Sequence, residues 1–222
     1  MLPVRDHLPT RSTPFVNYAL IATNVVVMGA ELTTGGVERW ALVPSEVLAH
    51  PLTLVTHMFL HANLAHLAGN MLFLWIFGDN VEDALGHARY AVLYLASGVL
   101  GALAEIAVTP HSGIAMLGAS GAISGVLAAY GALYPRSPIT VINPIPILWI
   151  FWGLFLSFPA WVVILEYFVA NLCHAFTTSS GAGGVAFAAH VGGFLAGLVL
   201  LRLMRSREAV AYDPWQALRA GR

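Results

Sequence analysis

Two serines stand one helical turn apart in an otherwise apolar stretch, Gly118–Tyr130. A serine hydroxyl becomes a useful nucleophile when a neighbouring base takes its proton. A loop rich in breakers precedes this stretch and Pro135 ends it, which places Ser120 at or near a helix start and Ser124 one turn inside. A helix start exposes a hydroxyl and an amide together, whereas a serine inside a helix usually bonds back to the preceding turn. We therefore favour Ser120 over Ser124 as the nucleophile.

Candidate partners for this serine stand in two other apolar segments. His190 lies near the start of the last one and is the candidate general base, because imidazole has a suitable pKa. His66 and Asn70 are four residues apart and share one helix face. A histidine, an amide side chain and the amides of a helix start can all stabilise a developing oxyanion. None of these motifs contains an acidic residue, which indicates a Ser–His dyad that would catalyse acyl transfer.

The composition indicates an integral membrane protein. Of the 222 residues, 58% are hydrophobic and only 9% are charged, against about 25% charged in soluble domains. The net charge of −1 and the absence of a basic run argue against a nucleic-acid partner. The single Cys173 excludes an internal disulfide and a thiolate zinc site, and we expect it to be a small buried apolar residue.

The apolar pattern predicts an all-α fold, a polytopic bundle of six transmembrane helices over residues 15–204. A polar N-terminal segment (1–14) and a polar C-terminal tail (205–222) flank it. The first span is read as retained, since no convincing cleavage site follows it. We expect a charged connector at 78–86, a Pro-rich connector at 135–146 and a Ser/Gly loop at 177–184. The six expected spans cover 15–29, 54–77, 89–108, 120–134, 147–172 and 185–204.

The distribution of arginines orients these spans. Arginines concentrate in the two terminal segments and in the connectors on the same side, and only Arg39 lies opposite, which places both termini in the cytoplasm. The second, fourth and sixth spans then all start on the outer side. The fourth, about 15 residues or roughly 22 Å long, is too short for a bilayer core of about 30 Å, so its start can lie below the surface. Ser120, His190 and the His66–Asn70 pair are thus expected in one outer layer.

Small residues are expected to let two of these spans approach closely. Gly121 and Gly125 lie on the fourth span, and Gly193 and Gly197 lie on the sixth. Small residues at a spacing of four let membrane helices pack backbone to backbone. This close packing would bring Ser120 within reach of His190.

Three ordered motifs together resemble the rhomboid family of intramembrane serine proteases: GASG at 118–121, AH-x-GG-x3-G at 189–197, and H-x4-H-x3-N at 61–70. The second connector, from Phe77 to Gly86, is also similar to that family. The resemblance covers essentially the whole chain.

The resemblance implies specific roles. Ser120 would be the nucleophile and His190 the base, while an oxyanion hole would form from His66, Asn70 and the amides around Gly118 and Ala119. It implies no cofactor, an active site toward the outer leaflet of a bacterial inner membrane, and transmembrane helices of single-pass membrane proteins as substrates, with membrane lipid as the other partner. Oligomeric state and the role of the fifth span in substrate entry stay open.

Two departures from the family leave substrate preference open. Some relatives carry an aromatic residue one turn after the serine, near the histidine, where Ser124 stands here. The Trp-Arg pair of some bacterial members is absent from the first outer loop.

Several other interpretations were weighed. A catalytically silent relative that binds transmembrane helices is the main alternative, although such a binder needs neither Ser120 nor His190. A zinc site is disfavoured because H-E-x-x-H is absent, and His61 is expected to make a structural loop hydrogen bond. We expect Glu105 and Glu166 to pair with nearby backbone or polar loop groups rather than to relay protons. The aromatic cluster between Trp149 and Trp161 is expected to face lipid or to anchor at the interface.

Overall fold

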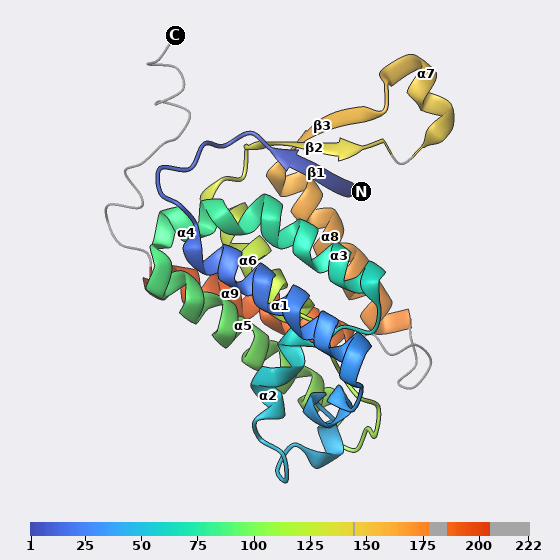
Figure 1. Cartoon of the computed structure of the whole chain (residues 1–222). Helices are drawn as coiled ribbons and strands as arrows, with labels where there is room; N and C mark the ends of the chain where they lie inside the picture. The colour runs from blue at the N-terminus through green and yellow to red at the C-terminus, as the bar shows by residue number, and fades with distance from the viewer. Residues whose placement is uncertain (144, 178–185, 205–222) are drawn as a thin grey trace.

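The structure is a computed structural model that describes residues 1–143, 145–177 and 186–204 (Figure 1). The expected Ser/Gly loop at 177–184 and the tail at 205–222 therefore lie almost entirely outside the described residues. The longer helices are α1 (Phe15–Thr34), α3 (Leu64–Phe73), α4 (Asp79–Leu85), α5 (His87–Val108), α6 (Ser120–Leu133), α8 (Ala160–Thr177) and α9 (Phe187–Met204).

Shorter elements connect these helices. The short helical turns are η1 (Val37–Trp40), η2 (Pro44–Glu46), α2 (Thr53–Thr56), η3 (His57–Phe59), the π-helical η4 (Leu74–Gly78), η5 (Pro146–Leu148) and α7 (Trp149–Trp152). The strands are β1 (Leu2–Asp6), β2 (Pro138–Ile142) and β3 (Phe155–Pro159), which form an antiparallel sheet in the order β1-β2-β3.

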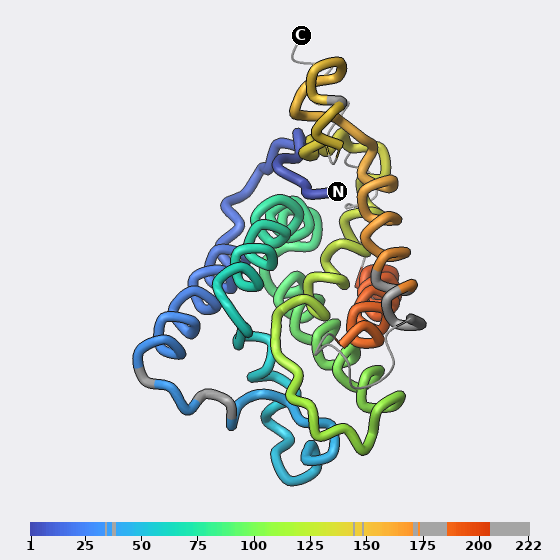
Figure 2. The backbone as a smooth tube through the Cα atoms, turned by 90° about the vertical axis from the view of Figure 1, so that its right-hand side faces the viewer, coloured from blue at the N-terminus to red at the C-terminus, as the bar shows by residue number. Residues whose placement is uncertain are grey.

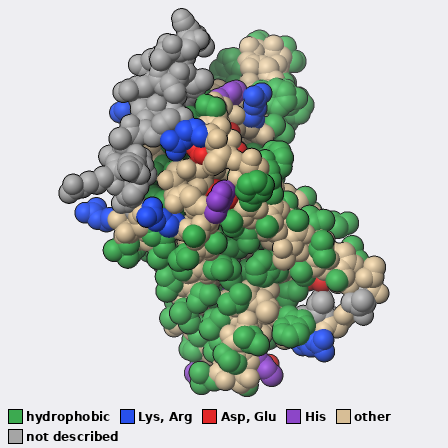
Figure 3. All heavy atoms as spheres, turned by 60° about the vertical axis from the view of Figure 1, so that its left-hand side comes forward, with side chains coloured by type: hydrophobic (Ala, Val, Ile, Leu, Met, Phe, Trp, Pro, Cys, Tyr) green, Lys and Arg blue, Asp and Glu red, His purple; other side chains and the backbone are tan. Residues whose placement is uncertain are grey.

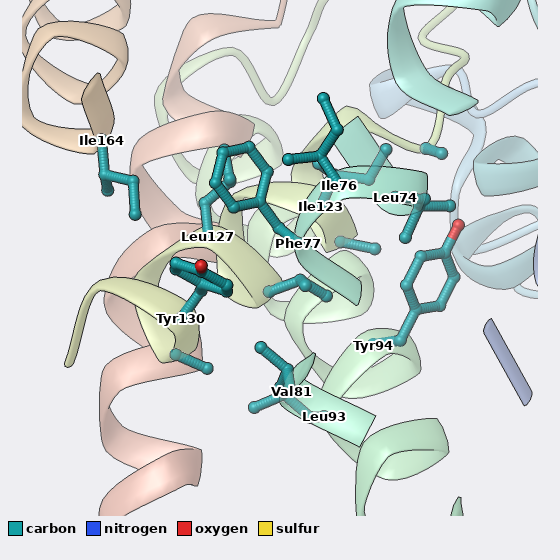
Figure 4. Packing of buried hydrophobic residues seen from close by; sticks show 14 of the residues in the cluster. Leu74, Ile76, Phe77, Val81, Leu93, Tyr94, Ile123, Leu127, Tyr130 and Ile164 are labelled. Carbon is teal, nitrogen blue, oxygen red and sulfur yellow. The ribbon is translucent and has the colours of Figure 1, made fainter. Parts of the chain in front are cut away.

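The helix α6 occupies the middle of the bundle, between α5, α9 and η4 (Figures 1 and 2). Every residue from Ala122 to Tyr130 is buried, as expected for a helix that is apolar on all sides. Figure 4 shows side chains from η4, α5 and α6 packed together, with Phe77 against the ring of Tyr130. The nucleophile candidate thus stands at the end of the most enclosed helix.

The chain is mostly helical, but the sequence-based count of six spans is not confirmed. By length and composition, three described helices could cross a membrane: residues 15–33 of α1, α5 and α9. A fourth span is obtained if the bent pair Thr53–Phe59 and Leu64–Leu85 counts as one. The helices α6 and α8 are apolar but shorter.

The second span was expected to be one helix over residues 54–77, and this is wrong. The chain bends by 94° between Phe59 and Leu64. Asn63 is extended there, and its side chain accepts a hydrogen bond from the amide of His66, which starts a new helix.

The charged connector expected at 78–86 is also wrong, because the chain stays helical through η4 and α4 until Gly86 (φ 78°). Its charged residues cap another helix instead. The buried carboxylate of Glu82 accepts hydrogen bonds from the amides of Val16 (2.9 Å) and Asn17 (2.7 Å) at the start of α1. A carboxylate at a helix start satisfies amides that have no helical partner.

The fifth span was expected over residues 147–172, but α8 begins only at Ala160. The preceding residues form β2, a tip with η5 and α7, and β3, so an all-α fold omits a three-stranded sheet. Prolines at 144, 146 and 159 and Gly153 (φ 78°) break a helix here. Ile139 and Val141 alternate with more exposed neighbours, and this period of two is that of a strand.

Hydrophobic side chains cover most of the face shown in Figure 3, and its arginine side chains gather mainly at one end. Exposed large apolar residues occur on α1, α5, α8 and α9. A membrane protein turns such faces toward lipid.

Candidate active site

The serine and histidine chosen from the sequence meet in the structure. Ser120 is the first residue of α6, and its Oγ lies 2.6 Å from Nε2 of His190 in the first turn of α9. With the imidazole proton on Nδ1, Nε2 accepts the hydrogen bond that the hydroxyl donates. This is the geometry that lets a histidine act as base toward a serine.

Close contact between α6 and α9 makes this distance possible. A Cβ atom added at Gly193 would lie 2.1 Å from the carbonyl oxygen of Gly121, and one at Gly197 would lie 2.5 Å from the Cα of Gly125. No side chain fits at either position, so the two backbones touch. Gly193 and Gly197 of α9 thus lie against Gly121 and Gly125 of α6.

Two further contacts brace the start of α9. A Cβ added at Gly101 of α5 would lie 2.5 Å from the carbonyl oxygen of Ala189, so α5 joins the same close-packed seam. Glu105 accepts a hydrogen bond from the amide of Ala189 at 3.1 Å. Glu105 thus pairs with backbone, as expected, and it does so beside the candidate base.

His66 and Asn70 reach the site from α3 and lie next to Gly118, two residues before Ser120. Gly118 has a φ of +124°, and a Cβ there would lie 2.7 Å from His66 Cε1 and 3.7 Å from Asn70 Nδ2. The amide of Gly118 donates to the carbonyl oxygen of His57 (2.9 Å), so this amide is already paired. Because Gly118 has no side chain, it leaves room for the ring of His66. Among the described residues, Asn70 Nδ2 is buried with no hydrogen-bond partner.

Ala119, named with Gly118 as an oxyanion candidate, is fully buried directly before α6. Its carbonyl accepts from the amide of Ile123. The amides at the start of α6 have no carbonyl of the preceding turn to bond, which leaves them available to a negative charge.

Ser124 makes the hydrogen bond expected of a serine inside a helix. Its Oγ lies 2.8 Å from the carbonyl oxygen of Ser120, and it also lies 3.0 Å from the hydroxyl of Tyr167 on α8. The ring of Tyr167 is 6.5 Å from that of His190, tilted by 38°. An aromatic ring from α8 thus stands beside the histidine, although none follows Ser120 by one turn.

The other two histidines of the second segment have structural surroundings. His57 is buried and its Nδ1 lies 2.8 Å from the carbonyl oxygen of Thr53. His61 packs edge-on against His66, with ring centroids 5.1 Å apart. The loop hydrogen bond expected of His61 is not found: both of its ring nitrogens are without a partner among the described residues.

A cavity of about 290 Å³ joins these groups. Its lining includes His66, Asn70, Ser120, Tyr167 and His190. The candidate nucleophile, the candidate base and an amide donor that is unpartnered among the described residues thus face one space, and this arrangement suits acyl transfer from a bound carbonyl.

The fold and the site together define a helical membrane protein with a serine–histidine pair inside the bundle. A family model described as Rhomboid domain matches residues 49–207, which is more than half of the chain. The chain belongs to the rhomboid family, and it is an integral membrane protein.

Named relatives come from several compartments. The chain is 29% identical over 190 residues to "Rhomboid protein 1, mitochondrial" of Saccharomyces cerevisiae, which covers 82% of this chain and 51% of the relative. It is 44% identical over 85 residues to "Rhomboid protease GluP" of Bacillus subtilis, covering 37% of this chain and 16% of the relative. It is 32% identical over 170 residues to "Rhomboid-like protein 11, chloroplastic" of Arabidopsis thaliana, covering 72% of this chain and 54% of the relative.

The chain thus spans about half or less of the length of these relatives. Because their names point to mitochondria and a chloroplast as well as a bacterium, the expectation of a bacterial inner membrane gains no support from them.

Sequence reasoning missed the contacts that two residues make at the site. Tyr167 lies 43 positions from Ser124, and no local pattern links them. Glu105 was singled out as an ionisable residue inside a span, but its partner Ala189 lies 84 positions away. An unusual polar residue in an apolar segment was the only available signal for Glu105.

Proposed function

We propose that this protein is an intramembrane serine endopeptidase that uses a Ser120–His190 dyad. The distance of 2.6 Å between Ser120 Oγ and His190 Nε2 carries the proposal. A protein that only binds helices gains nothing from this pair. The proposed substrates are transmembrane segments of membrane proteins, because the site lies within an apolar bundle.

In the first half of the reaction, Ser120 Oγ attacks the carbonyl carbon of the scissile peptide bond while its proton passes to His190 Nε2. The negative charge develops on the former carbonyl oxygen. Asn70 Nδ2, the ring of His66 and the amides at the start of α6 are the proposed donors to it. His190 then gives the proton to the leaving amine as the C–N bond breaks, which leaves an acyl-serine.

In the second half, a water molecule gives a proton to His190 and attacks the acyl carbon. The ester bond breaks, Ser120 takes the proton back, and the acid product leaves. One water is consumed for each peptide bond cut. Every proton passes through His190, so proton transfer needs no further residue.

We further propose that both termini lie on the cytoplasmic side. Among the described residues, Arg5 and Arg11 precede α1, Arg89 stands at the start of α5, Arg136 follows α6 and Arg202 stands near the end of α9, all on the side proposed to be cytoplasmic, whereas Arg39 follows α1 on the opposite side. This bias follows the rule that cytoplasmic loops carry the positive charge. The dyad would then face the outer leaflet.

The test is cleavage of a panel of single-span membrane proteins by the purified full chain in vesicles. We expect cleavage by the wild type and none by Ser120→Ala or His190→Ala, each still folded by circular dichroism. Ser124→Ala should keep cleaving, which makes it the matched control. Binding without cleavage by the wild type would favour the catalytically silent helix binder instead.

A further inference from the structure

The hairpin formed by β2, the tip and β3 (residues 138–159) carries no charged residue. None stands anywhere between Arg136 and Glu166. Its tip exposes large apolar side chains, with Ile150 at 81% and Phe151 at 75% exposure. The exposed apolar residues from the tip to the start of β3 are Ile145, Ile147, Trp149, Ile150, Phe151, Trp152, Leu154 and Phe155. Contiguous apolar surface of this kind marks an interaction site.

Several polar groups of the tip are paired within the tip itself. Asn143 is 2% exposed, and its amide donates to the carbonyl of Leu154 at 2.8 Å. Its side chain donates to the carbonyl of Gly153 and accepts from the amide of Ile145. The indole N–H of Trp149 donates to the carbonyl of Asn143 at 2.9 Å. A segment surrounded by lipid must satisfy its backbone groups in this internal way.

The register of the sheet gives the depth of the tip relative to α8. The Pro138 end of β2 pairs with Pro159, directly before α8 begins, and the other end pairs Leu2, Ile142 and Phe155 in one row. The nitrogen of Met1, next to that row, lies 3.0 Å from Glu166 Oε1. Glu166 is six residues into α8, roughly 9 Å along its axis. The hairpin therefore runs from the start of α8 toward the level of its second turn, and the tip lies beyond that row.

Polarity changes along the hairpin in the same direction. Near the start of α8, the sheet pairs Arg5 with Thr140 and Thr140 with Ser157, and Arg136 is exposed close by. His7 also bonds to Thr140 there. The row of Leu2, Ile142 and Phe155 and the tip beyond it are apolar. A polar base and an apolar, tryptophan-bearing tip fit a passage from water across the membrane interface.

We propose that this hairpin enters the lipid leaflet beside α8, tip first, with phospholipid as the partner of its exposed side chains. The helix α8, which follows β3 directly, exposes apolar side chains as well, at Trp161, Leu165 and Val169. In Figure 1 the tip projects away from the helical bundle, beyond the ends of β2 and β3. A polar protein partner would find no charge to pair with on this surface. The lipid-facing part of the protein thus includes a β-hairpin as well as helices.

The test places a fluorescent probe at Phe151→Cys in a Cys173→Ser background of the full chain, reconstituted in phosphatidylcholine vesicles. Val169→Cys on the exposed face of α8 is the lipid-facing control, and Thr10→Cys in the exposed loop before α1 is the aqueous control. Quenching is measured with lipids that carry a nitroxide near the headgroup and, separately, with aqueous iodide. All three sites are exposed side chains, so the substitutions leave the fold intact.

We expect the probe at residue 151 to match the probe at residue 169, with several-fold more lipid quenching and several-fold less iodide quenching than at residue 10. A probe at 151 that behaves like the one at 10 would place the tip in water and overturn the proposal. Protection from both quenchers would overturn it as well, because a protein surface would then cover the tip. If dilution of the protein in lipid removed that protection, the cover would be a second copy of the chain. None of these readings depends on proteolysis, so failure here leaves the proposed function standing.

Discussion

The helices α9 and α8 approach α6, the helix that begins with the candidate nucleophile, in different ways. The helix α9 meets α6 backbone to backbone, with Gly197 opposite Gly125 and no room for a methyl group. The helix α8 meets α6 through side chains, such as Tyr167 on Ser124, and a Cβ at Gly131 would find the side chain of Ile164 at 3.2 Å. A backbone contact fixes a distance, whereas side chains can change rotamer. The backbone contact between α6 and α9 thus fixes the distance between Ser120 and His190. The side-chain contact between α6 and α8 leaves the position of the Tyr167 ring adjustable.

The largest effect on stability and cleavage is expected from a side chain placed in the backbone contact between α6 and α9. Gly193→Val would push a side chain against the carbonyl of Gly121 and separate Ser120 from His190. We expect a loss of about 3 kcal/mol or more in stability, at the upper end of overpacking costs, together with loss of cleavage. Gly29→Ala on α1, where nothing lies within 4 Å of the added Cβ, is the control and should be nearly neutral. Thermal unfolding in detergent measures the stability of both variants. A stable and active Gly193→Val would refute the claim that the α6–α9 contact holds Ser120 and His190 together.

The next effect concerns the donor that shares the cavity with the dyad. Asn70→Ala should lower kcat by roughly 10²–10³, about 3–4 kcal/mol, with a smaller change in KM, since the donor acts on charge present only in the transition state. An interhelical hydrogen bond alone averages about 0.6 kcal/mol in membranes and would lower Tm instead. Measuring kcat, KM and Tm on one preparation separates these roles. A lower Tm with normal kcat would remove Asn70 from the oxyanion site.

A smaller effect is expected at the side-chain contact between α8 and α6. Tyr167→Phe keeps the ring beside His190 and removes the hydroxyl near Ser124, so kcat should change little; a neutral hydrogen bond contributes about 1 kcal/mol to stability. Tyr167→Leu removes the ring and should lower kcat more than Tyr167→Phe does. The pH profile of kcat should shift only in Tyr167→Leu, because only this variant changes the surroundings of the His190 imidazole. Equal profiles for both variants would mean that Tyr167 only fills space.

The parts of the site that the sequence predicted are those encoded by local spacing. Ser120 at a helix start, the His66–Asn70 face and the glycines facing each other across two helices all follow from short patterns. The β2–β3 hairpin was not predicted, because its run of apolar residues also fits a membrane-spanning helix. Only its prolines and the alternation of buried and exposed residues distinguish a hairpin from such a helix. Residues 78–86 were mistaken for a connector because Glu82 looks solvated in the sequence but caps α1. Tyr167 depends on tertiary packing, which no short pattern encodes.

The smallest effect on cleavage is expected far from the dyad, where β1 contacts the opposite end of α6. Asp6 accepts hydrogen bonds from Asn80 and from the hydroxyl of Tyr130. Burial, and then the nearby Asp79, raise the pKa of Asp6 from 3.8 to about 7. The folded state therefore holds a proton that the unfolded state releases near pH 4, and stability falls as pH rises from there to about 7.

The variant Asp6→Asn should flatten this part of the stability profile. The contribution of Asp6 has a slope of up to about 1.4 kcal/mol per pH unit, the value for one proton. Tm is measured between pH 4 and 8 for wild type and variant, with cleavage by the variant expected at a near-normal rate. A wild-type profile that rises with pH, or one that Asp6→Asn leaves unchanged, would contradict the assignment.

The central claim, that His190 activates Ser120 as a nucleophile, is tested most directly by covalent labelling with a fluorophosphonate probe. We expect the full chain in vesicles to be labelled on Ser120, located by peptide mass spectrometry, and labelling to be lost in Ser120→Ala and in His190→Ala while Ser124→Ala labels normally. Labelling on Ser124, or labelling of Ser120 that persists undiminished in His190→Ala, would contradict the account.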